Sequence, residues 1–210
     1  MARKIYNRNV FINCPIDAAY KRLFHAAVFA VLRCDFYPRC ASEEEDSGEL
    51  RLTKILRMIG ECRHGIHDLS RTQVDKRFGL PRFNMPFELG IFLGAKFYGD
   101  GDHARKVCLI FERQPYSYDK FISDIKGQDI AAHRNDPEVV IRKIRNWLAA
   151  NSSKWLPGGQ SLCVEFRRFE RWMPGKCLVE RLRMKDLTFG DYWNLVRAWI
   201  DLQKETNKHR

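Results

Sequence analysis

Short apolar runs alternate with longer segments of helical periodicity along the first 150 residues. The clearest runs, VFINC at 10–14 and VCLIF at 107–111, have the length and residue types of buried strands. Weaker strand signals follow at 34–40, 65–69 and 129–132. Between the strands, apolar residues recur every three or four positions, which predicts helices. These helical segments are 17–32, 52–59, 86–96, 118–125 and 136–150.

Five strand–helix units in succession predict an α/β fold with a parallel sheet covered on both faces. Five units fit a flavodoxin-like, doubly wound sheet with strand order 2-1-3-4-5. This domain is expected to span residues 1–150. A Ser/Pro/Gly-rich linker (NSSKWLPGGQ) opens the remainder, and residues 151–210 are expected to form a C-terminal helical appendage. Pro174 is expected to interrupt its first helix, and Thr188 to cap the second.

Composition excludes several classes of protein. The chain has 210 residues, of which 45% are hydrophobic and 12% aromatic, too many for a disordered tail. No window of about 18 residues is free of charge, and the N-terminus lacks the apolar run of a secretory signal, so no membrane partner is expected. The seven cysteines contain no Cys-x-x-Cys pair. They are interpreted as small buried hydrophobes of a cytoplasmic protein, with no metal site and no cofactor.

The charge of +11 favours an anionic partner. Residues 1–150 carry a net +6 and residues 151–210 a net +5, without a basic arm. The loop 70–83 adds a local excess, because Arg71, Lys76, Arg77 and Arg82 face only Asp75. No helix-turn-helix, RNP or zinc-finger signature supports nucleic-acid binding. The expected partner is therefore a phosphorylated nucleotide or nucleoside.

Polar residues follow the predicted strands, where ligands bind in open parallel sheets. The candidate ligand-binding residues are Asn13, Asp17, Arg39, Asp46, Ser47, Asp68, Ser70, Arg71 and Asn84. His64 and His67 could suggest a metal, but strand alternation places them on opposite faces, so they are not expected to share one.

Glu88 lies in a helix that is apolar nearly all round, MPFELGIFLGAKF. A buried carboxylate there is costly unless it is paired or used. The alternative is an ordinary first-turn acid, which the helix dipole stabilises by about 0.3–1 kcal/mol. The dipole would keep Glu88 ionised, as a nucleophile requires. Gly90 and Gly94 are expected to let this helix pack closely on the sheet. Dinucleotide, Walker A and serine-hydrolase motifs are absent.

Four motifs, VFINCP, the acidic Asp46–Ser47 loop, GIHDLS and MPFELG, resemble the nucleoside 2-deoxyribosyltransferase superfamily over residues 8–150. Its relatives include nucleotide N-glycosidases and, more distantly, the Toll/interleukin-receptor domains that cleave NAD. The resemblance implies that Glu88 is a nucleophile attacking C1′ of a ribosyl group. It implies that Asp68 orients the base or sugar, and that Asn13, Asp17 and Ser47 line the pocket.

Three functions remain open. The first is an enzyme that cleaves or transfers an N-ribosyl bond, with catalytic Glu88 and Asp68. The second is a nucleotide-sensing or signalling module of the same fold without turnover. The third is a basic nucleic-acid-binding protein, whose affinity would depend strongly on salt. Trp172, Trp193 and Trp199 make the tail apolar, which suggests a homodimer.

Overall fold

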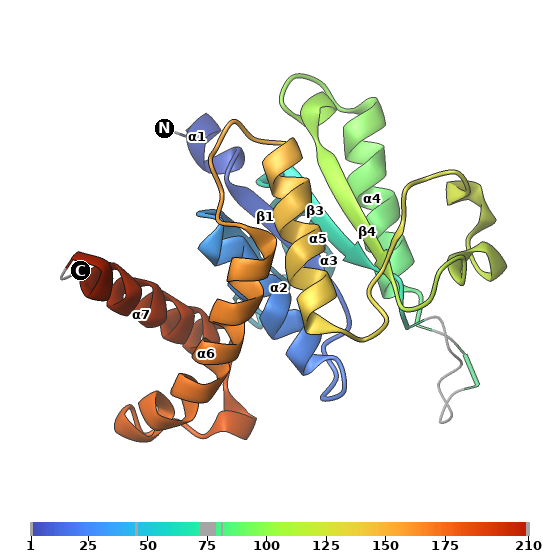
Figure 1. Cartoon of the computed structure of the whole chain (residues 1–210). Helices are drawn as coiled ribbons and strands as arrows, with labels where there is room; N and C mark the ends of the chain where they lie inside the picture. The colour runs from blue at the N-terminus through green and yellow to red at the C-terminus, as the bar shows by residue number, and fades with distance from the viewer. Residues whose placement is uncertain (1, 45, 72–78, 81, 209–210) are drawn as a thin grey trace.

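Five parallel strands form the centre of the protein, in the order β2-β1-β3-β4-β5 (Figure 1). The structure is a computed structural model that describes residues 2–44, 46–71, 79–80 and 82–208. The strands are β1 (Asn9–Asn13), β2 (Tyr37–Arg39), β3 (His64–Asp68), β4 (Val107–Glu112) and β5 (Ala131–Ala132). The expected fold class and strand order are thereby confirmed.

The strand register places the carboxyl ends of β1, β3 and β4 side by side, at the edge where a ligand site is expected. Asn13 at the end of β1 pairs with His67 of β3, and Asp68 pairs with Phe111 of β4. Every residue of β1 and β3 is buried, as expected for central strands covered on both faces.

Seven α-helices and four 3₁₀ turns connect and cover the sheet in the described part of the chain. The helices are α1 (Ala2–Tyr6), α2 (Lys21–Arg33), α3 (Arg51–Gly60), α4 (Asn84–Tyr98), α5 (Pro137–Ala150), α6 (Gly159–Val179) and α7 (Phe189–Lys208). The 3₁₀ turns are η1 (His103–Arg105), η2 (Tyr118–Lys120), η3 (Ser123–Ile125) and η4 (Met184–Asp186). Helices α2 and α5 share a core with one face of the sheet, while α3 and α4 share a core with the other. No helix of the described residues is long and apolar enough to cross a membrane.

Alternation along β3 sends its two histidines to opposite faces, as predicted. The His64 ring contacts Phe36 and Trp147 on the α2 and α5 side. The His67 ring contacts Phe11 and Phe92 on the α3 and α4 side. Six of the seven cysteines are buried and Cys108 is half-buried, which agrees with their interpretation as small hydrophobes.

Three helix predictions are wrong in detail. Helix α2 begins at Lys21 instead of residue 17, and Asp17 Oδ1 accepts the Tyr20 N–H at 3.0 Å in the turn before it. The segment 118–125 is predicted as a helix but forms the 3₁₀ turns η2 and η3. Apolar residues three or four positions apart can pack on the same hydrophobic cluster from an α-helix or from 3₁₀ turns, so their spacing does not distinguish the two. Pro174 stays inside α6; it is exposed there, so water can solvate the carbonyl that loses its donor.

Helices α6 and α7 pack directly on the α2 and α5 side of the sheet. Phe29 of α2 contacts Phe166 and Phe169 of α6, with ring centroids 5.2 and 5.4 Å apart. Both C-terminal helices belong to the same hydrophobic core as β1, α2 and α5. The tail tryptophans also turn inward: Trp199 is only 6% exposed, and Trp172 and Trp193 pack against the core. The three tryptophans therefore do not supply an exposed apolar surface for self-association, although Trp155, Leu178 and Val179 of the tail are exposed.

Candidate functional site

Two adjoining hollows lie at the carboxyl edge of the sheet, where β1 and β2 end and α2 and α4 begin. The smaller one has a volume of about 10 Å³, room for a single water molecule, and the larger a volume of about 240 Å³. Both are lined by Ile16, Phe24 and Ser42, so they adjoin through these three residues. Open α/β sheets bind ligands at this edge.

Glu88 lines the smaller hollow together with Asn13, Cys14 and Cys40. Its side chain is 4% exposed, and burial raises the pKa of the carboxyl from 4.5 to about 7 against a small opposing effect of Arg51. Among the described residues, none hydrogen-bonds or ion-pairs with this carboxylate. An unpartnered buried carboxylate facing a hollow is typical of a functional group.

The expectation that the helix dipole keeps Glu88 ionised is wrong. Helix α4 begins at Asn84, two residues earlier than predicted, so Glu88 lies in the second turn and the first turn holds no acid. The dipole effect falls off beyond the first turn, and desolvation outweighs it.

Asn13 fixes the start of α4 against β1. Its Nδ2 donates to the Met85 carbonyl oxygen at 2.9 Å and to His67 Nδ1 at 3.1 Å. His67 accepts that bond as a neutral ring, since burial lowers its pKa to about 3. Asn13 Oδ1 is buried without a partner. Asn13 therefore positions the turn of α4 that carries Glu88 and offers an acceptor in the same hollow.

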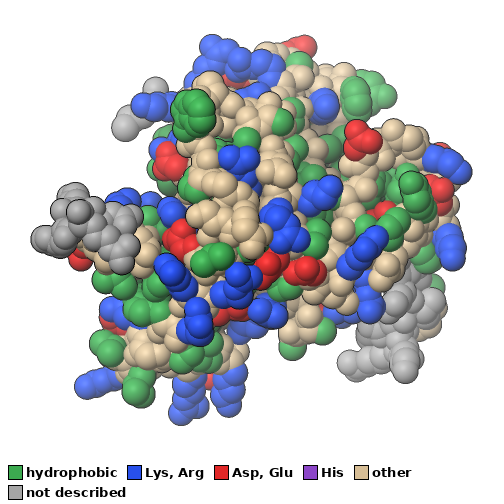
Figure 2. Space-filling model, in the orientation of Figure 1, with side chains coloured by type: hydrophobic (Ala, Val, Ile, Leu, Met, Phe, Trp, Pro, Cys, Tyr) green, Lys and Arg blue, Asp and Glu red, His purple; other side chains and the backbone are tan. Residues whose placement is uncertain are grey.

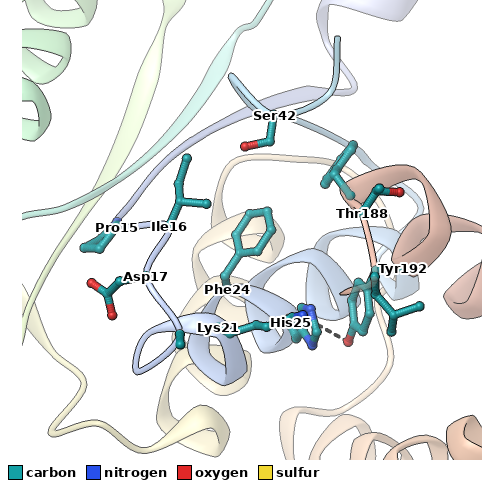
Figure 3. A pocket seen from close by; sticks show the side chains of 12 residues that line it. Pro15, Ile16, Asp17, Lys21, Phe24, His25, Ser42, Thr188 and Tyr192 are labelled. Atoms are coloured by element: carbon teal, nitrogen blue, oxygen red, sulfur yellow. Dashed lines mark hydrogen bonds between the residues drawn. The ribbon is translucent and has the colours of Figure 1, made fainter. Parts of the chain in front are cut away.

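The larger pocket is shared between the two ends of the chain. Its walls come from residues 15–18 after β1, from the first turns of α2, and from Leu187, Thr188, Phe189 and Tyr192 at the start of α7. Figure 3 shows Ile16, Phe24 and Ser42 directed toward its interior. The Tyr192 ring stacks on His25 at 3.7 Å, and its hydroxyl donates to the His25 carbonyl oxygen at 3.0 Å (Figure 3). Sequence reasoning missed this wall, because only long-range packing brings α7 to α2.

Charged groups stand at the rim of this pocket. Asp17 accepts a hydrogen bond from Arg71 Nη2 at 2.7 Å. Lys21 Nζ donates to the Lys185 carbonyl oxygen at 3.1 Å. Burial, with help from Lys21, lowers the pKa of His25 to about 4, so its ring is neutral at physiological pH. A ligand with one anionic group could meet the Lys21 ammonium here.

Asp68 lies at the end of β3 but lines neither hollow. It is fully buried and accepts hydrogen bonds from the Tyr20 hydroxyl at 2.6 Å and the Ser70 N–H at 2.8 Å. His133 Nε2 lies 3.1 Å from the same Oδ2 that Tyr20 contacts. With these partners, Asp68 positions the loops around the site instead of offering a free carboxylate to a ligand.

Sequence reasoning missed His133, because it follows a strand of only two residues. The Asn135 N–H donates to His133 Nδ1 at 2.9 Å, so Nε2 carries the proton of the neutral ring. That nitrogen faces both Asp68 and Ser70 Oγ, the latter at 2.6 Å. In a serine hydrolase, Ser and Asp contact opposite ring nitrogens. The three residues therefore do not form a nucleophilic triad.

Four other predicted residues lie away from both hollows. Arg39 pairs with Glu43 at 2.7 Å and Glu61 at 2.9 Å, and lines a separate open pocket with Asn9. Asp46 accepts the Gly48 N–H at 2.8 Å in an exposed turn. Ser47 and Asn84 are exposed. In the basic loop 70–83, residues 72–78 lie outside the described part, so Asp75, Lys76 and Arg77 cannot be placed.

The fold and this site define the class: a flavodoxin-like α/β protein with a buried carboxylate beside a ligand-sized pocket. No protein-family model, curated protein or solved structure matches the chain. Among the described residues, no group of three or more His, Cys, Asp and Glu side chains could hold a metal ion.

Proposed function

We propose that this protein cleaves or transfers the N-ribosyl bond of a phosphorylated nucleotide, a nucleoside or an NAD-like molecule. The observation that carries the proposal is the buried Glu88 carboxylate, which has no hydrogen-bond or ion-pair partner among the described residues and lines the hollow that adjoins the larger pocket. Cleavage of such a bond passes through an oxocarbenium-like state, which an adjacent carboxylate stabilises or captures. The seven free thiols support a cytoplasmic location.

In this mechanism, ionised Glu88 attacks C1′ while the bond from C1′ to the base breaks. The base leaves with the bonding electron pair and takes up a proton. Water, or an acceptor hydroxyl or amine, then attacks C1′, gives up its proton and releases the Glu88 carboxylate. The larger pocket has room for the leaving base, and Lys21 at its rim offers a cation to a substrate phosphate.

The proposal is tested by incubation with NAD and a panel of nucleosides and nucleotides, followed by chromatography for free base. Glu88→Gln is expected to lower the rate by roughly 100-fold or more. The matched control is Glu180→Gln, since Glu180 is exposed at the end of α6. Because attack requires ionised Glu88, whose pKa is about 7, the wild-type rate is expected to rise between pH 6 and pH 8.

Full activity of Glu88→Gln would contradict the nucleophilic role. An inactive wild-type protein on every panel member would contradict the enzyme and favour the sensing module. One observation favours that second function: Asp68 is fully engaged and lines neither hollow, so it supplies no second acid to help the base leave. Calorimetry that shows tight nucleotide binding without product formation would then support the sensing module.

A further inference from the structure

Helix α4 presents a row of exposed aromatic side chains on the face opposite Glu88. Phe83, just before the helix, is 64% exposed, Phe87 56%, Phe97 69% and Tyr98 92%. Side chains of this size are usually buried, and contiguous exposed apolar patches mark interaction sites. Figure 1 shows α4 on the far side of the sheet from α6 and α7, so those two helices do not cover it.

Two glycines lie between these aromatics, with their surfaces open. A Cβ atom built on Gly90 or Gly94 would meet no atom within 4 Å. The prediction that these glycines allow close packing on the sheet is therefore wrong, because they point away from it. Without side chains, they let the backbone of another helix approach closely.

Together these residues form the α4 stripe: Phe83, Phe87, Gly90, Gly94, Phe97 and Tyr98. At about 100° of rotation per residue they occupy an arc of about 100° on one helix face. The inner face of the same helix holds Glu88, Leu89 and Phe92, all buried.

The centre of the stripe reads the same in both directions. Phe87, Gly90, Gly94 and Phe97 are spaced symmetrically about Phe92. If two copies of α4 cross antiparallel, a two-fold axis near Phe92 places Phe87 opposite Phe97 of the other copy and Gly90 opposite Gly94. Isologous dimers require this self-complementarity. A heterologous partner would not.

The charge distribution and the exposed area of the stripe are both compatible with a second copy of this chain as the partner. The chain carries a net charge of +11, so two copies repel each other overall. The repulsion is weakest where the contacting surfaces carry no charge. Within α4 the only charged residues are Glu88, which is buried, and Lys96, which is half-buried and whose ammonium lies 5.6 Å from the centre of the Phe97 ring at one end of the stripe. The four aromatics expose about 560 Å² per copy, or about 1,100 Å² in a pair, taking about 200 Å² per ring residue. If all of this area became buried, it would exceed the roughly 1,000 Å² expected of a biological interface and fall just below the roughly 1,200 Å² at which standard-size interfaces begin.

We propose that a second copy of this chain docks on the α4 stripe, with the two α4 helices antiparallel across a two-fold axis. The glycines form the crossing point, and pairs of Phe87 and Phe97 rings close it on both sides. Glu88 faces the other way, so the dimer leaves both hollows open. The proposal does not depend on the proposed activity.

Sedimentation equilibrium of the full chain tests it. The wild-type protein is expected to have twice the 24.8 kDa mass of the single chain at micromolar concentrations. The double variant Phe87→Glu/Phe97→Glu is expected to be monomeric, with an unchanged circular dichroism spectrum. The matched control, Leu178→Glu/Val179→Glu, changes two equally exposed apolar residues on α6, 80% and 74% exposed, and is expected to remain dimeric.

Mixing two single variants tests the orientation. In the antiparallel pair, Phe87→Glu on one chain faces Phe97→Lys on the other, so a 1:1 mixture is expected to dimerise at least tenfold more tightly than either variant alone. A parallel pair would bring 87 to 87 and show no such gain. A monomeric wild type at all concentrations, a dimeric Phe87→Glu/Phe97→Glu variant, a monomeric control, or no gain on mixing would each overturn the proposal.

Discussion

At the scale of single residues, Glu88 is the side chain that opposes stability most clearly. Burial raises its pKa from 4.5 to about 7, so between these pH values the folded state binds more protons than the unfolded state. The free energy of unfolding therefore falls as the pH rises across this window. The shift corresponds to about 3 kcal/mol at most.

Glu88→Gln is expected to remove this pH dependence. The variant should be more stable than the wild-type protein at pH 8, by up to about 3 kcal/mol, and similar to it at pH 4.5. Urea unfolding at both pH values measures the difference, with Glu180→Gln as the control. A variant that is less stable than the wild type at pH 8 would show that the Glu88 carboxylate has a stabilising partner.

The sequence revealed Glu88 and left most of its surroundings hidden. A lone acid among Phe87, Leu89 and Ile91 is visible in any reading of the chain. The network around Asp68 is not, because Tyr20 and His133 reach it from loops more than 40 residues away in either direction. Local spacing carries no information about such contacts. For the same reason Arg39, although it ends strand β2, could not be assigned in advance to the pocket beside Asn9.

At the scale of elements, strands were easier to predict than helix ends. The five short apolar runs are all strands, since a central parallel strand needs apolar residues on both faces. Helix starts moved by two to four residues at α2 and α4, where the periodicity does not show which residue takes the first turn. The start of α7 is the exception, because the capping residue Thr188 is recognised by its hydroxyl group and not by periodicity.

Thr188 caps α7 beside the larger pocket. Its Oγ1 accepts the Asp191 N–H at 3.1 Å, while Asp191 Oδ2 accepts the Thr188 N–H at 3.0 Å. Thr188→Ala is expected to lower the free energy of unfolding by about 1 kcal/mol. Urea unfolding measures the loss. The control is Thr206→Ala, an exposed residue late in the same helix, which should change stability by less than about 0.5 kcal/mol. Equal effects would exclude a capping role for Thr188.

At the scale of the whole molecule, residues 151–210 are bound into one core with the sheet domain. Besides the Phe29 contacts, two bidentate ion pairs join α2 to α6: Arg22 with Glu170 at 2.8 and 3.0 Å, and Arg33 with Glu165 at 2.7 and 2.8 Å. Other basic side chains gather along α6 and the turn toward α7, at the lower left of Figure 2. Both ion pairs use carboxylates of the tail and arginines of α2, so they do not account for the positive charge of the tail.

A chain that ends at residue 150 is expected not to fold alone. It would expose Phe29 and the rest of the α2 face that α6 and α7 cover, at a cost of about 1.5–3 kcal/mol for each large side chain. Near-ultraviolet circular dichroism and sedimentation velocity are expected to show loss of fixed packing or aggregation. Addition of a 151–210 fragment should restore the native spectrum. A cooperative unfolding transition in the shortened chain would contradict this prediction.

The shared wall of the larger pocket has a consequence for synthesis of the protein. Residues 15–18 and Glu88 are synthesised first, and Leu187 to Tyr192 follow about 100 residues after Glu88. A nascent chain can thus display its carboxylate long before the pocket has a closed side. A nascent chain that has not reached Tyr192 lacks one wall of the pocket, so it is not expected to bind the ligand.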